Sequence, residues 1–103
     1  MSTIVVLFNL KEGVNPRDYE NWAKTVDIPT VNALPSVSRF SVNRARNLLM
    51  SDATPPYQYV ETIAVEDEEA FFESLGTKKM QAVAAEFGAF AETPIFTMMD
   101  DII

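Results

Sequence analysis

The segment that most constrains this chain is residues 3–10, which read Thr-Ile-Val-Val-Leu-Phe-Asn-Leu. The segment is rich in β-branched and aromatic residues and is too short to form an independent helix, so it predicts a strand. Because it is apolar on both faces, we expect this strand to lie in the centre of a sheet. The later segments must then supply the neighbouring strands and the elements that pack on both faces of the sheet.

A helix is predicted after this strand, beginning at Asn15, which can cap it, and at the proline that follows. Pro29 disfavours helical geometry at Ile28, so we expect the helix to stop or kink near Asp27, before a turn through residues 30–34. An apolar stripe at helical spacing should face the sheet: Tyr19, Trp22, Ala23 and Val26.

Two further strands are predicted at residues 37–46 and 57–65, separated by a loop at residues 47–56 that contains two prolines. In the first of these strands, strict alternation places Ser38 on the same face as Phe40.

Two more helices and a strand complete the chain. Asp67 and Thr77 are candidate N-caps, and the helix after Asp67 has an acidic first turn that suits the helix dipole. Pro94 opens a last strand that runs to Met99. The helix after Thr77 has an apolar stripe: Met80, Val83, Ala84, Phe87 and Phe90.

The resulting order is β-α-β-β-α-α-β, which is typical of an α+β, ferredoxin-like split βαβ fold with a four-stranded antiparallel sheet and helices on one face. The length of 103 residues predicts a single domain over residues 1–103. The opposite face of the sheet is left uncovered, so we expect a homodimer that pairs as a dimeric α/β barrel.

Composition limits the chemistry and the partners. The 15 acidic and 8 basic residues give a net charge of −7, which argues against nucleic acid and anionic membranes as partners. No segment is long and apolar enough to span a bilayer, and the first residues lack the features of a signal peptide, so we expect a cytoplasmic protein. Without Cys or His, no metal and no cofactor is predicted.

Two carboxylates are candidate catalytic residues, and each also has a structural interpretation. Asp27 is placed unfavourably near a helix C-terminus, which suggests either a pocket acid or base or a cap for the turn at Pro29. Glu61 is predicted inside a strand, where it either anchors a ligand or pairs with Arg39 or Tyr59.

The candidate ligand-binding residues are polar groups near Glu61 and aromatic groups on the helices. Flat heterocycles stack well on aromatic rings, although ordinary packing of helices on a sheet also explains these rings. The candidates are Asn9, Tyr19, Trp22, Arg39, Tyr59 and Phe87.

The stretch of residues 27–36, Asp-Ile-Pro-Thr-Val-Asn-Ala-Leu-Pro-Ser, resembles the dimeric α/β-barrel superfamily, in which a helix commonly ends in His-x-Pro and Leu-Pro-Gly leads into the second strand. Glu61 and the acidic helix start at residues 66–71 also resemble that superfamily. Along the whole chain, the sequence is similar to the RedY-like HapK proteins. Asp27 stands where histidine is common and Ser36 where glycine is common, so a histidine-dependent mechanism cannot be carried over.

This resemblance implies a role in prodiginine-type pigment biosynthesis with a small aromatic or pyrrole-containing ligand. Three functions stay open. The first is binding of an intermediate, with or without a metal-free proton-transfer or oxidative step. The second is a non-catalytic escort of another pathway enzyme. The third is a cofactor-independent aromatic monooxygenase.

We predict that the purified protein contains no stoichiometric zinc, iron or haem, because it lacks the Cys and His side chains that hold these groups most often. Elemental analysis of protein purified without chelators measures this directly. One tightly held transition metal per chain would overturn the prediction.

Overall fold

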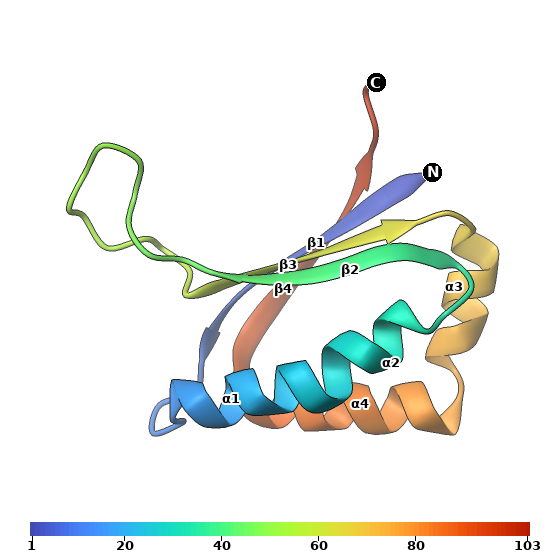
Figure 1. Cartoon of the computed structure of the whole chain (residues 1–103), viewed down its shortest axis with the longest axis horizontal. Helices are drawn as coiled ribbons and strands as arrows, with labels where there is room; N and C mark the ends of the chain where they lie inside the picture. Colours follow the sequence, from blue (N-terminus) through green and yellow to red (C-terminus); the bar gives the residue numbers. More distant parts are fainter.

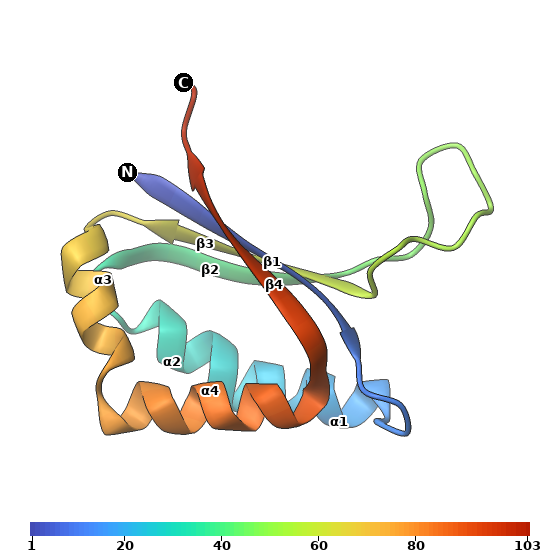
Figure 2. The ribbon, with the colours of Figure 1, turned by 180° about the vertical axis from the view of Figure 1, so that it is seen from behind.

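The computed structural model describes residues 1–103, which form one four-stranded antiparallel sheet with the helices on a single face (Figure 1). The view from behind shows the same arrangement, with the opposite face uncovered (Figure 2). In chain order the elements are β1 (Ser2–Leu10), α1 (Pro16–Trp22), the π-helical turn η1 (Ala23–Asp27), α2 (Ile28–Asn32), β2 (Val37–Arg44), β3 (Tyr59–Val65), α3 (Glu68–Leu75), α4 (Lys78–Phe90) and β4 (Ala91–Asp100).

The strand order β2-β3-β1-β4 places the first strand in the interior of the sheet, as its apolar sequence predicts. The α+β ferredoxin-like prediction is therefore confirmed. None of the helices is both long enough and apolar enough to cross a membrane.

The three predicted N-caps are confirmed. The side chain of Asn15 accepts a hydrogen bond from the backbone N–H of Arg17, with proline in the first turn of α1. Asp67 and Thr77 cap α3 and α4 in the same way. These side chains satisfy N–H groups that have no partner inside the helix.

The predicted turn through residues 30–34 is wrong, because the helical path continues to Asn32. At η1 the N–H of Ile28 donates to the carbonyl of Ala23, five residues back, and Pro29 then lies in the first turn of α2. Proline is tolerated there because the first N–H groups of a helix have no internal partner, and the wider π turn relieves its clash with the preceding turn. The predicted kink near Asp27 is thus a widened turn, not a break.

Several strand boundaries and one strand face also differ from prediction. The last strand, β4, begins at Ala91 and not at Pro94. β2 ends at Arg44 and β3 begins at Tyr59, because the connection between them is longer than its loop-forming residues indicate. The pairing of β2 with β3 shifts between Val37 and Arg39. This irregularity ends the strict alternation, so Ser38 is exposed while Val37 and Phe40 are both buried.

The register of the sheet decides which side chains face the helices. Glu61 lies opposite Val6 on one neighbouring strand and opposite Val42 on the other. Directly opposed residues share a face, so Glu61 points toward the helices from an interior strand. The core between the sheet and the helices includes Ile4, Val6, Phe8, Phe40, Tyr59, Ile63, Tyr19, Val31, Phe71, Met80 and Phe87.

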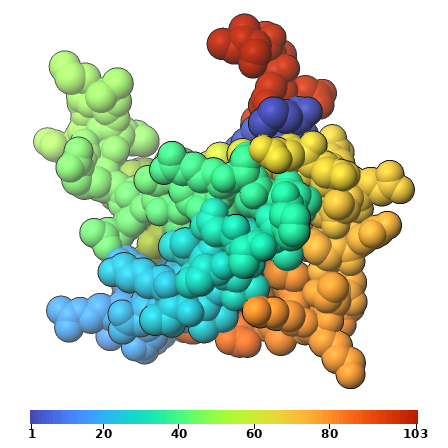
Figure 3. All heavy atoms as spheres, turned by 45° about the vertical axis from the view of Figure 1, so that its right-hand side comes forward, coloured from blue at the N-terminus to red at the C-terminus, as the bar shows by residue number.

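The connection between β2 and β3 projects from the body of the molecule, as does the C-terminal end of the chain (Figure 3). The base of this loop is fastened to β1. Asn9 donates to the carbonyl of Pro56 and accepts from the N–H of Gln58, whose own side chain accepts from the N–H of Leu10. Asn9 therefore holds the loop and does not reach the helix side of the sheet.

The face of the sheet without helices is apolar in its middle. Val5 lies opposite Thr62 and Thr97, and Leu7 lies opposite Val60 and Ile95. Ile95 is 47% exposed in the single chain, which is unusual for a large apolar side chain in a sheet. This face has the character of an interface.

We predict that Ile95→Glu converts a wild-type homodimer into a monomer, because it places a charge on the sheet face that we expect the partner subunit to cover. Phe72→Glu is the matched control, since Phe72 is 51% exposed but lies on α3, among the helices. Analytical ultracentrifugation should give about twice the 11.5 kDa chain mass for the wild type and the control, and the chain mass for Ile95→Glu. A dimeric Ile95→Glu variant would show that another surface holds the subunits together.

Candidate active site

A cavity of about 470 Å³ lies between the helix-facing side of the sheet and helices α2, α3 and α4. Thirteen of its sixteen lining residues are hydrophobic, and the other three are Asp27, Glu61 and Gln81. Its rim between α3 and β4 is marked by half-exposed apolar side chains: Phe72, Leu75, Phe96 and Met98. The site is thus an apolar cavity, open at one side, with a few polar groups in its wall, as is usual for small-molecule sites.

The π-helical turn explains how Asp27 reaches this cavity. Tyr19, Ala23, Asp27 and Val31 are all buried, and each lies four residues after the last. In a regular α-helix each step of four residues turns about 40° around the axis, so such a row drifts off the buried face. The wider turn at η1 reduces this drift and keeps Asp27 directed at the sheet.

Asp27 is 5% exposed and makes no capping hydrogen bond. Its interpretation as a cap for the turn at Pro29 is therefore wrong. Burial raises the pKa of the Asp27 carboxyl to about 7, because the apolar surroundings disfavour the charged form. Near neutral pH this group is close to the midpoint of its titration.

Glu61 faces the same cavity from β3 and is 4% exposed. Its Oε2 accepts a hydrogen bond of 3.2 Å from the hydroxyl of Tyr19. Burial raises the pKa of Glu61 to about 8, repulsion from Asp27 adds to the rise, and the Tyr19 hydrogen bond opposes it. Burial also raises the pKa of Tyr19, and the negative charge of Glu61 adds to this, so Tyr19 stays a proton donor.

The expected partners of Glu61 are wrong. Arg39 lies opposite Ala64, on the face of the sheet without helices, so it cannot reach Glu61. Tyr59 shares a face with Glu61, but its hydroxyl donates to Glu20 at 2.7 Å. Neither a salt bridge nor a hydrogen bond to Tyr59 therefore stabilises the Glu61 carboxylate.

Asp27 and Glu61 form a pair of carboxyls in one apolar cavity, close enough for their charges to interact. Because the two charges repel, adding the second negative charge is harder than adding the first. Near neutral pH one group can donate a proton while the other accepts one, which is what general acid–base catalysis requires. No cluster of three or more potential metal ligands is formed.

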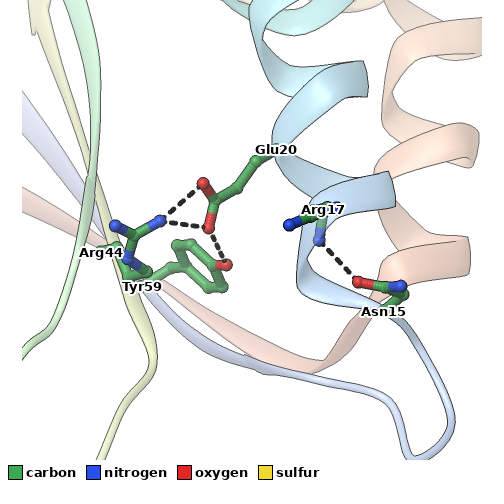
Figure 4. Close-up of polar contacts among 5 residues, drawn as sticks. All are labelled: Asn15, Arg17, Glu20, Arg44 and Tyr59. Carbon is green, nitrogen blue, oxygen red and sulfur yellow. Dashed lines mark hydrogen bonds and ion pairs between the residues drawn. The ribbon is translucent and has the colours of Figure 1, made fainter.

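A second, more polar cavity of about 310 Å³ is lined in part by Tyr19 and Tyr59. In its wall the Nη1 of Arg44 donates to both carboxylate oxygens of Glu20, at 2.7 and 2.8 Å, and Tyr59 donates to the same carboxylate (Figure 4). These hydrogen bonds hold the pKa of Glu20 below its usual range. Sequence reasoning missed this network, because Glu20 and Arg44 meet only through the fold.

The predicted aromatic residues are divided between the two cavities. Phe87 lines the apolar cavity, whereas Tyr19 and Tyr59 line the polar one. Trp22 lines neither cavity, and its indole N–H donates to Glu86. The ring centroids of Tyr19 and Tyr59 lie 4.8 Å apart in an edge-to-face contact.

Comparison with known proteins identifies the family. The family described as REDY-like protein HapK matches residues 2–102. The chain belongs to the REDY-like HapK family. The crystal structure of HapK from Hahella chejuensis is 32% identical in sequence, with a TM-score of 0.80 over 99% of this chain and 93% of that one. No curated protein sequence matches the chain significantly.

Two more distant structures share the fold of this HapK family member. A dimeric ferredoxin-like protein of unknown function from Thermobifida fusca has a TM-score of 0.77 and 14% identity, over 97% of this chain and 90% of that one. SnoaB, a cofactor-independent oxygenase from Streptomyces nogalater, has a TM-score of 0.74 and 20% identity, over 99% and 93%. At these identities the likeness shows the fold alone.

We predict that the protein loses stability as the pH rises. Asp27 and Glu61 titrate near pH 4 in an unfolded chain, but near 7 and 8 in the folded protein. Between these limits the folded state holds more protons than the unfolded state. The resulting stabilisation is complete below about pH 4 and is lost as the pH rises through about 7 to 8.

Urea unfolding at a series of pH values measures this effect. From about pH 5 to 8.5 the free energy of unfolding should fall by on the order of a few kcal/mol. The slope should be shallower in Asp27→Asn and in Glu61→Gln, and unchanged in Asp52→Asn, which removes a carboxylate from the exposed loop. A wild-type stability that does not fall over this range would contradict the assigned protonation states.

Proposed function

We propose that this protein binds a small ring-containing organic molecule in the apolar cavity, and that Asp27 and Glu61 move a proton on it without a metal or cofactor. The carboxyl pair carries the proposal. Buried carboxyls without a cationic partner cost stability, so their presence in the wall of an open cavity favours a chemical role.

Membership of the REDY-like HapK family supports a more specific substrate. We propose a pyrrole-containing intermediate of prodiginine-type biosynthesis. The walls of the cavity favour such a ligand, since Phe40, Phe71 and Phe87 offer faces and edges to a flat ring while Asp27 and Glu61 offer oxygens to its N–H groups.

The proposed step is a proton relocation that changes neither the composition nor the oxidation state of the ligand. The protonated carboxyl gives its proton to a ring carbon, and the ionised carboxylate removes a proton from another ring position. The pair ends with one proton, as it began, so no oxidant, reductant or leaving group is needed. Tyr19, held by Glu61, is a positioning residue for that carboxylate.

Binding is tested first, by thermal denaturation in the presence of pyrrole-2-carbaldehyde and of 2,2′-bipyrrole. A ligand that binds only the folded state raises the melting temperature. A rise that is lost when Val83→Trp fills the cavity places the ligand there, whereas no rise with either compound favours the escort function.

Proton transfer is tested by exchange of ring protons of 2,2′-bipyrrole for deuterium in D2O, followed by NMR. We predict that the protein accelerates this exchange, and that Asp27→Asn and Glu61→Gln each slow it by about 10²–10⁴-fold, the usual cost of removing a general acid or base. Glu86→Gln is the matched control, because this carboxylate contacts Trp22 outside the cavity.

Two results would contradict this assignment. Exchange at the wild-type rate in the Asn and Gln variants would show that the pair is not the acid and base. Conversion of the bipyrrole that consumes dissolved oxygen, and that stops under anaerobic conditions, would favour a cofactor-independent oxygenase instead.

A further inference from the structure

The ionisable groups that line the apolar cavity are all acidic. Asp27 and Glu61 are its only ionisable lining residues, and neither Lys nor Arg is among the sixteen residues that line it. Arg44 is directed into the other cavity, where its guanidinium is paired with Glu20. A ligand in the apolar cavity therefore meets two carboxyl groups and no compensating cation.

This arrangement treats ligands of different charge differently. An anion would lose its hydration shell on entering the cavity. It would also bind only when both carboxyls are protonated, because an ionised carboxylate would repel it. A cation would stabilise the ionised form of a buried carboxyl and form short, charge-assisted hydrogen bonds with it. The net charge of −7 also attracts cations to the protein over long range.

The aromatic walls of the cavity also favour cationic ligands. Phe40, Phe71 and Phe87 line the cavity together with Glu61, and the face of an aromatic ring attracts a desolvated cation. A flat ligand with delocalised positive charge can use the rings and the carboxyls together.

We infer that the apolar cavity selects flat nitrogen compounds that are bound as cations, such as protonated heteroaromatic bases or amidines, and rejects carboxylated or phosphorylated ligands of the same shape. This inference rests on the proposed function, because it concerns the same cavity. It adds a substrate class that the position of the carboxyl pair alone does not give.

The test uses three probes with one ring system: 2-naphthamidine, 2-naphthamide and 2-naphthoate. They are close in size and carry charges of +1, 0 and −1 at neutral pH. Isothermal titration calorimetry at about pH 7.5 should give an affinity for the amidine about tenfold or more above that for the amide, with the naphthoate weaker again.

Variants then assign the preference to the carboxyl pair. In the double variant Asp27→Asn/Glu61→Gln, the advantage of the amidine over the amide should fall to about threefold or less, because no carboxylate remains in the cavity. The two single variants each report a partial loss if the double variant does not fold. Glu86→Gln should leave the preference unchanged.

The outcomes separate this inference from the proposed function. Equal binding of the amide and the amidine to the wild type would overturn the charge selection and leave the cavity as a ligand site. A double variant that keeps the full preference for the amidine would overturn the role of the carboxyls. Binding of none of the three probes would overturn the charge selection, whereas the proposed function is decided separately by the bipyrrole experiments.

Discussion

The ring of Tyr19 is the contact on which the arrangement of the helices on the sheet depends. It is fully buried, with the ring of Phe8 5.4 Å away on β1, that of Tyr59 4.8 Å away on β3 and that of Phe90 5.8 Å away on α4. One side chain thus joins the first helix, two interior strands and the last helix. Each aromatic pair adds to the free energy gained from burial, so the Tyr19 ring holds these four elements together.

At the other end of the helical layer, the apolar cavity lies between the helices and the sheet. Asp27 and Glu61 face this cavity, and the hydroxyl of Tyr19 joins Glu61 to the aromatic cluster. Carboxyls in such surroundings reduce stability compared with apolar residues of the same size. Natural sequences depart from good packing mainly where function requires it, and here both buried carboxyls face the apolar cavity.

Much of the fold could be predicted from the sequence, because local signals and tertiary packing agree. Asn15, Asp67 and Thr77 mark helix starts through hydrogen bonds with their own neighbours, and residues 3–10 are apolar enough to require an interior strand. The continuation of the helix past Pro29 could not be predicted from the usual effect of proline. The four-residue spacing of Tyr19, Ala23, Asp27 and Val31 was the available signal, and it becomes meaningful only with a widened turn.

Predicting the site was harder, since partners across a sheet depend on register. Sequence reasoning selected Asp27 and Glu61, but it gave Glu61 the wrong partners because the irregular pairing of β2 and the face of Arg39 are not visible in the sequence. Glu20 and Arg44 are 24 residues apart, and nothing in their local sequence connects them.

The fastening of the β2–β3 connection has an evolutionary consequence. Asn9 and Gln58 close the base of the loop with side-chain hydrogen bonds, and the carbonyl of Gln58 accepts from the N–H of Ala45. The residues beyond these hydrogen bonds contribute little to the order of the sheet, and lengthening a loop whose ends are already held costs little entropy. Insertions, deletions and new side chains can therefore accumulate at the tip while the sheet below stays unchanged, which makes this loop the part of the molecule most open to diversification.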